Sequence, residues 1–325
     1  MGRIPQLDGL RGIAILAVFM HHALKVKMLW MGVDLFFVLS GFLITGILLN
    51  TKDQSIGEYL AHFYSRRARR IVVPYLLALV VVSLIFGIAW ARYWYFYIGL
   101  TNFILPLQIP QPVAFDPLWS LAVEEQFYVV WPSAVYFLSE RHLGWLAGGM
   151  VLLAPVLRGV CHFQAHWPIY ALTPFRMDLL AAGALICLAY RNRSTAVERW
   201  GAKAGLPLVL VGGAGLALLA RFGVSTSGNT RTGNVLIYEC ALLASVGLML
   251  WALSGWRVAV LRWSPLSYIG RISYTMYLVH LAVLTLLLAW MPSWQAAIAG
   301  LSVTVVYATA SWYAIERPLL ARTKA

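Results

Sequence analysis

Residues 32–50 read GVDLFFVLSGFLITGILLN, and Asp34 is the one charged residue among them. An apolar run of about 20 residues has the length that an α-helix needs to cross a bilayer. Because lipid satisfies no backbone polar group, only helices and closed barrels span membranes. A barrel strand would alternate apolar and polar residues over about ten positions, and this run shows no such alternation. The stretch therefore predicts a transmembrane helix.

The rest of the chain has a similar composition. Of its 325 residues, 61% are hydrophobic and 11% are charged, and the mean hydropathy is +0.75. An ordinary soluble domain has roughly 25% charged residues, so a soluble enzyme and a disordered chain are excluded. Cys161, Cys187 and Cys240 are scattered and odd in number, which indicates neither a disulfide framework nor a metal site. We expect an all-α, polytopic transmembrane helical bundle that forms a single integral-membrane domain over residues 1–325, without a soluble C-terminal domain.

Ten transmembrane segments are predicted from the apolar runs. They cover approximately residues 9–27, 32–50, 71–91, 118–138, 144–161, 173–190, 204–221, 234–253, 268–290 and 295–315. The net charge is +13, and most of the 25 lysines and arginines lie in the connections on the side of the N-terminus. Cytoplasmic loops of membrane proteins carry such an excess. We therefore expect both termini in the cytoplasm, and the charge requires no nucleic-acid partner.

The connection between the second and third segments is predicted to contain a short interfacial helix. It begins with a capping-box pattern, in which Ser55 is followed three residues later by Glu58. Apolar residues then recur at positions 56, 59, 60, 63 and 64, which is typical of an amphipathic helix in the membrane interface. This helix runs into a cluster of four arginines, Arg66, Arg67, Arg69 and Arg70. Guanidinium groups suit phosphates, so the cluster is a candidate phosphate site, although topology and lipid headgroups would also account for it.

Ionisable residues inside apolar segments are candidates for function, because a charge at the bilayer centre costs about 2.5–3.5 kcal/mol on insertion scales. Arg11 and His22 lie in the first segment, and their spacing places them on one helix face. Glu124 and Glu125 lie in the fourth segment, near the expected depth of His22. Adjacent helical residues differ by about 100° in direction, so we expect only one of the two acids to face a shared cavity. A histidine beside a carboxylate is a general-base arrangement.

Other polar residues of the segments have a structural alternative. Asp34, Arg176 and Asp178 begin the second and sixth segments, and His280 lies near the middle of the ninth. These residues either support the substrate or form structural ion pairs and hydrogen bonds. We expect no metal ion, because the adjacent histidines of the first segment point apart. The sequence also contains no nucleotide-binding, zinc-protease or serine-nucleophile motif.

The motifs together resemble those of the acyltransferase-3 family of bacterial integral-membrane O-acyltransferases. Residues 7–12 (LDGLRG) with His22 are similar to its Arg/Lys-x10-His signature. Residues 32–42, 66–70, 119–128, 175–183 and 273–280 resemble its other motifs in order, and residues 316–318 (ERP) resemble its C-terminal signature. The resemblance extends over nearly the whole chain.

This resemblance implies a fold and a reaction. A ten-helix domain in the bacterial cytoplasmic (inner) membrane would take an acyl group, most commonly acetyl, from acyl-CoA in the cytoplasm. The acceptor would be a hydroxyl on a sugar of a cell-surface glycan or glycolipid, and membrane lipid would surround the bundle. The acceptor's identity, the acyl chain length and the oligomeric state stay open.

The same resemblance suggests a mechanism for the candidate residues. The phosphates of acyl-CoA would lie on Arg66, Arg67, Arg69 and Arg70. His22 would be the general base, and Glu124 or Glu125 would orient its ring. Arg11 would support the His22 face or contact the donor. Alternatively, His22 would itself be acylated and would pass the group outward.

Three other functions fit part of the pattern. A related enzyme would acylate a small molecule in the cytoplasm, such as a macrolide. A transporter or flippase of a lipid-linked sugar would also place ionisable groups inside a bundle, although no inverted repeat is visible. A membrane scaffold with structural ion pairs is the third alternative. Binding of acyl-CoA separates the enzymes from the other two classes.

Overall fold

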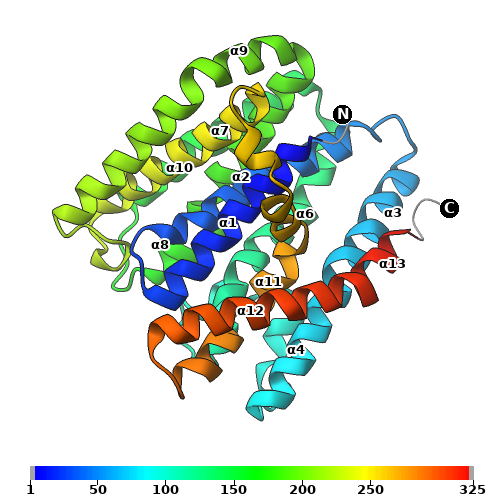
Figure 1. Cartoon of the computed structure of the whole chain (residues 1–325). Helices are drawn as coiled ribbons and strands as arrows, with labels where there is room; N and C mark the ends of the chain where they lie inside the picture. The colour runs from blue at the N-terminus through cyan, green and yellow to red at the C-terminus, as the bar shows by residue number, and fades with distance from the viewer. Residues whose placement is uncertain (1–3, 322–325) are drawn as a thin grey trace.

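The computed structural model describes residues 4–321 and consists of helices, with no strand in that range (Figure 1). The longer helices are α1 (Pro5–Leu24), α2 (Gly32–Leu49), α3 (Ile56–Arg67), α4 (Val73–Phe86), α6 (Trp119–Phe137), α7 (Glu140–Val160), α9 (Met177–Arg221), α10 (Arg231–Ser254), α11 (Ser264–Leu288) and α12 (Ser293–Ser311). Short helical pieces connect them: η1 (Leu29–Met31), η2 (Ala68–Val72), η3 (Trp90–Ile98), α5 (Thr101–Ile104), η4 (Val113–Leu118), α8 (Trp167–Ala171), η5 (Thr173–Phe175), η6 (Thr226–Gly228), η7 (Ala259–Arg262), η8 (Trp312–Glu316) and α13 (Arg317–Ala321). The predicted all-α bundle is confirmed.

Eight helical runs of the described chain are long and apolar enough to cross a membrane, which supports an integral membrane protein. The difference from the ten predicted segments has two causes. Predicted segments 173–190 and 204–221 both lie in α9, whose helix bends sharply at Arg193 (φ −146°, ψ 54°). Helix α6 covers predicted segment 118–138, but Glu124 and Glu125 reduce its apolar character. The ten segments therefore correspond to helices of the structure, and two of those helices are joined in α9.

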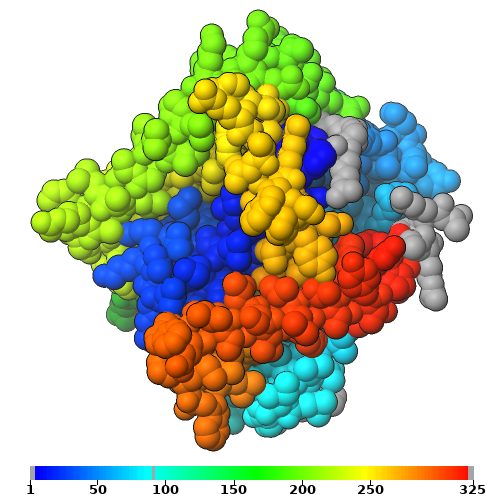
Figure 2. Space-filling view, in the orientation of Figure 1, coloured from blue at the N-terminus to red at the C-terminus, as the bar shows by residue number. Residues whose placement is uncertain are grey.

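Helix α2 lies at the centre of the bundle. It packs against α1, α6, α9 and α10. Seventy-eight per cent of its most apolar stretch is buried, against 22% for α7 and 22% for the run that contains α12. In the space-filling view, the segment around η7 (yellow) and α12 (orange to red) lie over part of α1 (blue) (Figure 2). The peripheral helices thus leave their outer faces to lipid and shield the polar residues of α1 and α2.

A helix, α3, is present where the interfacial helix was predicted, and its start has the expected cap. The Ser55 hydroxyl accepts a hydrogen bond from the Glu58 amide at 3.4 Å, and the Glu58 carboxylate accepts one from the Ser55 amide at 3.3 Å. Tyr59 and Phe63 are buried, whereas Ile56 is exposed. Helix α3 continues through the π-helical turn η2 into α4 without an interruption. Because π-helical turns often occur at functional sites, we treat the arginines of this junction as candidate site residues.

Two pairs of central helices approach each other closely at glycines. A Cβ atom at Gly270 of α11 would overlap the carbonyl oxygen of Asp8 in α1, and one at Gly41 of α2 would overlap the carbonyl oxygen of Leu180 in α9. Transmembrane helices associate largely through such van der Waals contact between small residues. These contacts set how α1 faces α11, and they therefore determine which side chains of the two helices meet.

The glycine contact of α11 predicts a selective loss of stability. Gly270→Ala should lower the free energy of unfolding by about 1–3 kcal/mol, because the added methyl group forces α1 and α11 apart. Gly149→Ala is the matched control, since a Cβ at this glycine in α7 meets nothing within 4 Å. Thermal unfolding of the two variants in detergent checks this expectation. Equal stability of both would contradict the close contact between α1 and α11.

Candidate active site

A cavity with about 910 Å³ of empty space, part of it open to the surroundings, lies between α1, α2, α6, α11 and the η2 turn. Its walls include apolar side chains of α2, such as Phe36 and Leu43. Its polar groups include Arg67, Glu124 and Tyr277. Binding sites for small molecules are commonly concave and mostly apolar with a few converging polar groups. This cavity is therefore the candidate substrate site.

A second cavity, with about 750 Å³ of empty space, adjoins the first. Both are lined by Arg11, Leu43, Ile47 and Arg70. The second cavity extends to Ile4 before α1 and to Asn50 after α2, at what we call the arginine end of the bundle. The opposite end of α1, which carries His22, is the histidine end. The two cavities form a path that leads from the arginine end into the bundle.

The arginine cluster separates into two pairs. Arg67 and Arg70 line the main cavity, whereas Arg66 and Arg69 are exposed and line neither cavity. Residues three apart share a helix face, which explains the division. The guanidinium of Arg67 also lies 5.0 Å from the ring centre of Tyr128. The geometry therefore brings only two of the four predicted phosphate-binding arginines, Arg67 and Arg70, to the cavity.

Arg11 joins this pair. It lines both cavities and interacts electrostatically with Arg70, Asp8 and Glu124. The sequence left open whether Arg11 supports His22 or contacts the donor, and the structure places it with the cavity arginines. Three arginines from α1, α3 and η2 thus converge on one space.

Of the two adjacent acids, only Glu124 lines the main cavity, as predicted. Its two carboxylate oxygens accept hydrogen bonds from the Ser40 hydroxyl at 2.7 Å and the Tyr128 hydroxyl at 3.0 Å. Glu125 points instead toward Gly99, at the connection before α5. Glu124 is therefore held as a cavity carboxylate facing the arginines.

The predicted pairing of His22 with Glu124 or Glu125 is wrong. His22 Nδ1 lies 3.0 Å from the Val18 carbonyl oxygen and 3.1 Å from Nε2 of His280. The two imidazole rings come from α1 and α11, and their centres are 5.0 Å apart. The prediction rested on the similar depth of His22 and the two acids in the membrane. The side chain of His22, however, points toward α11 and not toward the acids of α6.

His22 does not line the main cavity, but Tyr277 lines it and lies beside His280. The Tyr277 ring lines the cavity, and its centre is 5.6 Å from that of the His280 ring. The Tyr277 hydroxyl is 2.6 Å from the Ser120 hydroxyl and donates to the Pro117 carbonyl at 3.0 Å. The inner end of the cavity is thus one aromatic ring away from the histidine pair.

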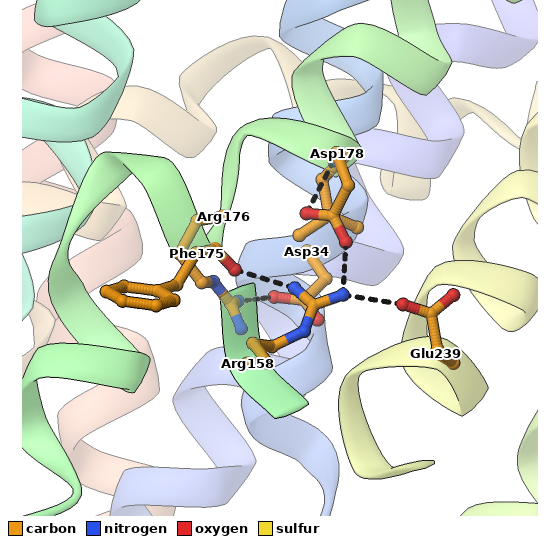
Figure 3. Close-up of polar contacts among 7 residues, drawn as sticks. Asp34, Arg158, Phe175, Arg176, Asp178 and Glu239 are labelled. Atoms are coloured by element: carbon orange, nitrogen blue, oxygen red, sulfur yellow. Dashed lines mark hydrogen bonds and ion pairs between the residues drawn. The ribbon is translucent and has the colours of Figure 1, made fainter. Parts of the chain in front are cut away.

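Asp34, Arg176 and Asp178 belong to a separate buried ionic network rather than to the cavity (Figure 3). Arg176 is paired with Asp34 of α2. Arg158 of α7 lies 2.6 Å from Asp178 and 2.5 Å from Glu239 of α10. Figure 3 shows these side chains converging from different helices. Of the two roles expected for the three predicted residues, the geometry favours structural support.

Two members of this network were not predicted as site residues. They are Arg158 of α7 and Glu239 of α10. Arg158 is fully buried and also donates to the Phe175 carbonyl at 2.6 Å. The guanidinium of Arg176 is surrounded by the rings of Trp30, Phe37, Trp119, Tyr170 and Tyr238, at 4.5–5.9 Å from their centres. These rings keep water from the pair, so the charges depend on each other.

The isolation of this pair predicts strong coupling between its members. Asp34→Leu should destabilise the protein by about 3–5 kcal/mol, because it leaves the Arg176 charge buried without its partner. The double variant Asp34→Leu/Arg176→Met should recover most of this loss, since no unpaired charge remains. Unfolding of the two single variants and the double variant in detergent measures the coupling. Additive effects would contradict the pairing.

Among residues 4–321, no group of three histidine, cysteine or acidic side chains is arranged to hold a metal ion. The polar groups of the cavity and the histidine pair can bind an anion, orient a carbonyl and accept a proton. These are the requirements of a group transfer to a hydroxyl.

Comparison with known proteins agrees with this chemistry. A family model described as an acyltransferase domain matches residues 4–317. The chain is 29% identical to a peptidoglycan O-acetyltransferase of Listeria monocytogenes over 97% of its own length and 56% of the relative. It is 27% identical to a putative peptidoglycan O-acetyltransferase of Bacillus subtilis, over 97% of this chain and 55% of the relative.

A putative O-acetyltransferase of Staphylococcus aureus is 25% identical over 98% of this chain and 57% of the relative. The chain thus spans about half the length of the curated relatives it matches. No solved structure matches it. Because the family model covers nearly all of the chain, the protein belongs to the acyltransferase-3 family.

Proposed function

We propose that this protein transfers an acetyl group from acetyl-CoA in the cytoplasm to a hydroxyl of a cell-surface glycan, with peptidoglycan as the first acceptor to test. One observation carries the proposal: a path lined by Arg11, Arg67 and Arg70 leads from the arginine end to Tyr277, beside the histidine pair. The names of the relatives support acetyl as the group and peptidoglycan as the acceptor.

The arginine end suits the phosphates of the donor. Acetyl-CoA carries several phosphate charges at one end and a neutral thioester at the other. Planar guanidinium groups bind phosphate oxygens in pairs, and three of them line the path. The apolar wall of α2 then accommodates the uncharged pantetheine arm. In this arrangement the thioester points toward Tyr277.

His22 is proposed as the general base. Its imidazole takes the proton of the acceptor hydroxyl as the oxygen attacks the thioester carbonyl carbon. The carbon–sulfur bond then breaks, and the sulfur of CoA leaves with the proton that His22 received. The products are an acetyl ester and free CoA. In this mechanism the Tyr277 ring, which lines the cavity and lies beside His280, moves to let the thioester reach His22.

The proposal includes an orientation in the bacterial cytoplasmic membrane. With the arginine end facing the cytoplasm, Arg66, Arg69 and the start of α1 lie on the side where CoA is present. The excess of lysines and arginines in the same connections supports this orientation. It also places both termini in the cytoplasm and the histidine end nearer the outer surface, where the acceptor is.

The division of the arginine cluster predicts a split effect on donor affinity. Arg67→Gln/Arg70→Gln should raise KM for acetyl-CoA by about 10–100-fold, because hydrogen bonds to a charged group contribute about 1.5–3 kcal/mol. Arg66→Gln/Arg69→Gln removes the same charge from the same stretch, and its KM should stay within about twofold, since exposed charges are screened. CoA release by purified protein in detergent measures both. Equal KM values for the two double variants would remove the cavity arginines from the donor site.

Loss of the base predicts a different kinetic signature. His22→Gln should lower kcat for CoA release by about 10²–10⁴-fold with little change in KM, since general-base catalysis contributes about this factor. In sealed vesicles, release should occur only when acetyl-CoA is on the side of the arginine end. Wild-type turnover by His22→Gln would exclude His22 as the base. A folded wild-type protein that neither binds acetyl-CoA nor releases CoA would favour a transporter.

A further inference from the structure

His22 and His280 belong to a chain of hydrogen bonds in which the donor and the acceptor of each bond follow from the partners. His280 is fully buried in α11, and its Nδ1 lies 2.8 Å from the carbonyl oxygen of Tyr277, one helical turn earlier. Its Nε2 lies 3.1 Å from Nδ1 of His22. Nδ1 of His22 also lies 3.0 Å from the Val18 carbonyl oxygen. Two backbone carbonyls therefore stand at the two ends of the chain.

The carbonyl of Tyr277 determines the tautomer of His280. A carbonyl oxygen only accepts hydrogen bonds, so Nδ1 of His280 must carry the proton. In a neutral imidazole the other nitrogen is then an acceptor. Nε2 of His280 therefore presents a lone pair to His22.

The same reasoning applies to His22. Its Nδ1 faces two acceptors, the Val18 carbonyl oxygen and Nε2 of His280, so Nδ1 must carry the proton. Nε2 of His22 is then the unprotonated nitrogen of the neutral ring. No hydrogen bond to it is found within residues 4–321, and the His22 side chain is half-buried rather than enclosed. The basic nitrogen, Nε2 of His22, is thus on the opposite side of the ring from Nδ1, which contacts the Val18 carbonyl and His280.

We infer that His280 is the positioning residue of the proposed base: it holds His22 in the tautomer whose Nε2 can accept the proton of the acceptor hydroxyl. This inference deepens the proposed function and rests on it. A histidine base in enzymes is commonly oriented by a group that binds its other nitrogen and stabilises the imidazolium. Here a second histidine, rather than the carboxylate expected from the sequence, occupies that place.

The environment of the pair explains why a neutral partner suffices. The neighbouring His21 ring is 5.0 Å from His22, and its Nδ1 is occupied by the Val26 carbonyl at 3.0 Å. The acids Glu124 and Glu125 make their contacts elsewhere. When His22 takes a proton, both its N–H groups become donors. Nδ1 then donates to His280 more strongly, because hydrogen bonds from an ionised donor are about twice as strong as neutral ones.

Two amides at position 280 separate this role from simple packing. The Oε1 atom of glutamine can reach the place of Nε2 of histidine, and it accepts a hydrogen bond. Asparagine has one methylene less, so its amide reaches the Tyr277 carbonyl but not His22. His280→Gln should keep kcat for CoA release from acetyl-CoA within about fivefold of wild type, whereas His280→Asn should lose about 10²-fold. KM should stay near wild type in both, because His280 does not line the cavity.

The tautomer itself is read by ¹⁵N nuclear magnetic resonance of the histidine rings in detergent. Signals of His22 are assigned by their absence from the spectrum of His22→Gln. We expect wild type and His280→Gln to show a protonated Nδ1 and a bare Nε2, and His280→Asn to show a mixture of tautomers. This measurement needs no acetyl-CoA, so it tests the role of His280 even if the wild-type protein releases no CoA. Absence of CoA release would instead contradict the proposed function.

Three results would overturn the inference. One is a wild-type His22 that carries its proton on Nε2. Another is full kcat in His280→Asn. The third is a loss of kcat in His280→Asn while the His22 tautomer stays as in wild type, since His280 would then act by some route other than His22.

Discussion

Charged groups buried in a membrane bundle must find partners within the protein, and this requirement determines how α2, α7, α9 and α10 are arranged. Asp34, Arg158, Asp178 and Glu239 each come from a different one of these helices, and Arg176 stands at the start of α9. An ion pair in a dry interior is only stable when both partners are present in good geometry. The helices therefore cannot slide past one another without breaking several charge contacts. The network thus fixes α2, α7, α9 and α10 relative to one another. Helix α2 also forms one wall of the cavity.

The cavity shows the opposite arrangement of charge. Three arginines line the two connected spaces, and the acids that line them are Glu124 and Asp8. The ionisable side chains of the cavity thus have one positive charge in excess, whereas the network has three acids for its two arginines. An excess of buried cations is costly in the empty state, and an anionic ligand relieves the cost. The same physics that makes the network a support thus favours an anionic ligand in the cavity, as the proposed function requires.

The sequence predicted what depends on local spacing. Apolar runs located the helices, and the capping pattern at Ser55 located the start of α3. The separation of Glu124 from Glu125 followed from adjacency on a helix. Spacing could also have divided the arginines, because Arg67 and Arg70 are three residues apart and share a face.

Contacts between distant helices could not be predicted in this way. His22 and His280 are 258 residues apart, and no periodicity links them. Their meeting depends on how closely α1 approaches α11, which is set by Gly270 against the Asp8 carbonyl. The membership of Arg158 in the ionic network likewise depends on the packing of α7 against α9 and α10. Arg158 lies near the end of predicted segment 144–161, and only the packing of its helix against α9 and α10 shows that it is the centre of a buried cluster.

Tyr277 connects the two halves of the proposed mechanism through different atoms. Its ring lines the cavity, and its backbone carbonyl accepts a hydrogen bond from Nδ1 of His280. The ring can move without disturbing the carbonyl, because the carbonyl belongs to the backbone of α11 while the ring turns about its own side-chain bonds. In the proposed mechanism, the donor thioester can therefore reach His22 while the hydrogen bonds that hold the tautomer of His22 stay in place. Ring movement and control of the tautomer thus depend on different atoms of the same residue.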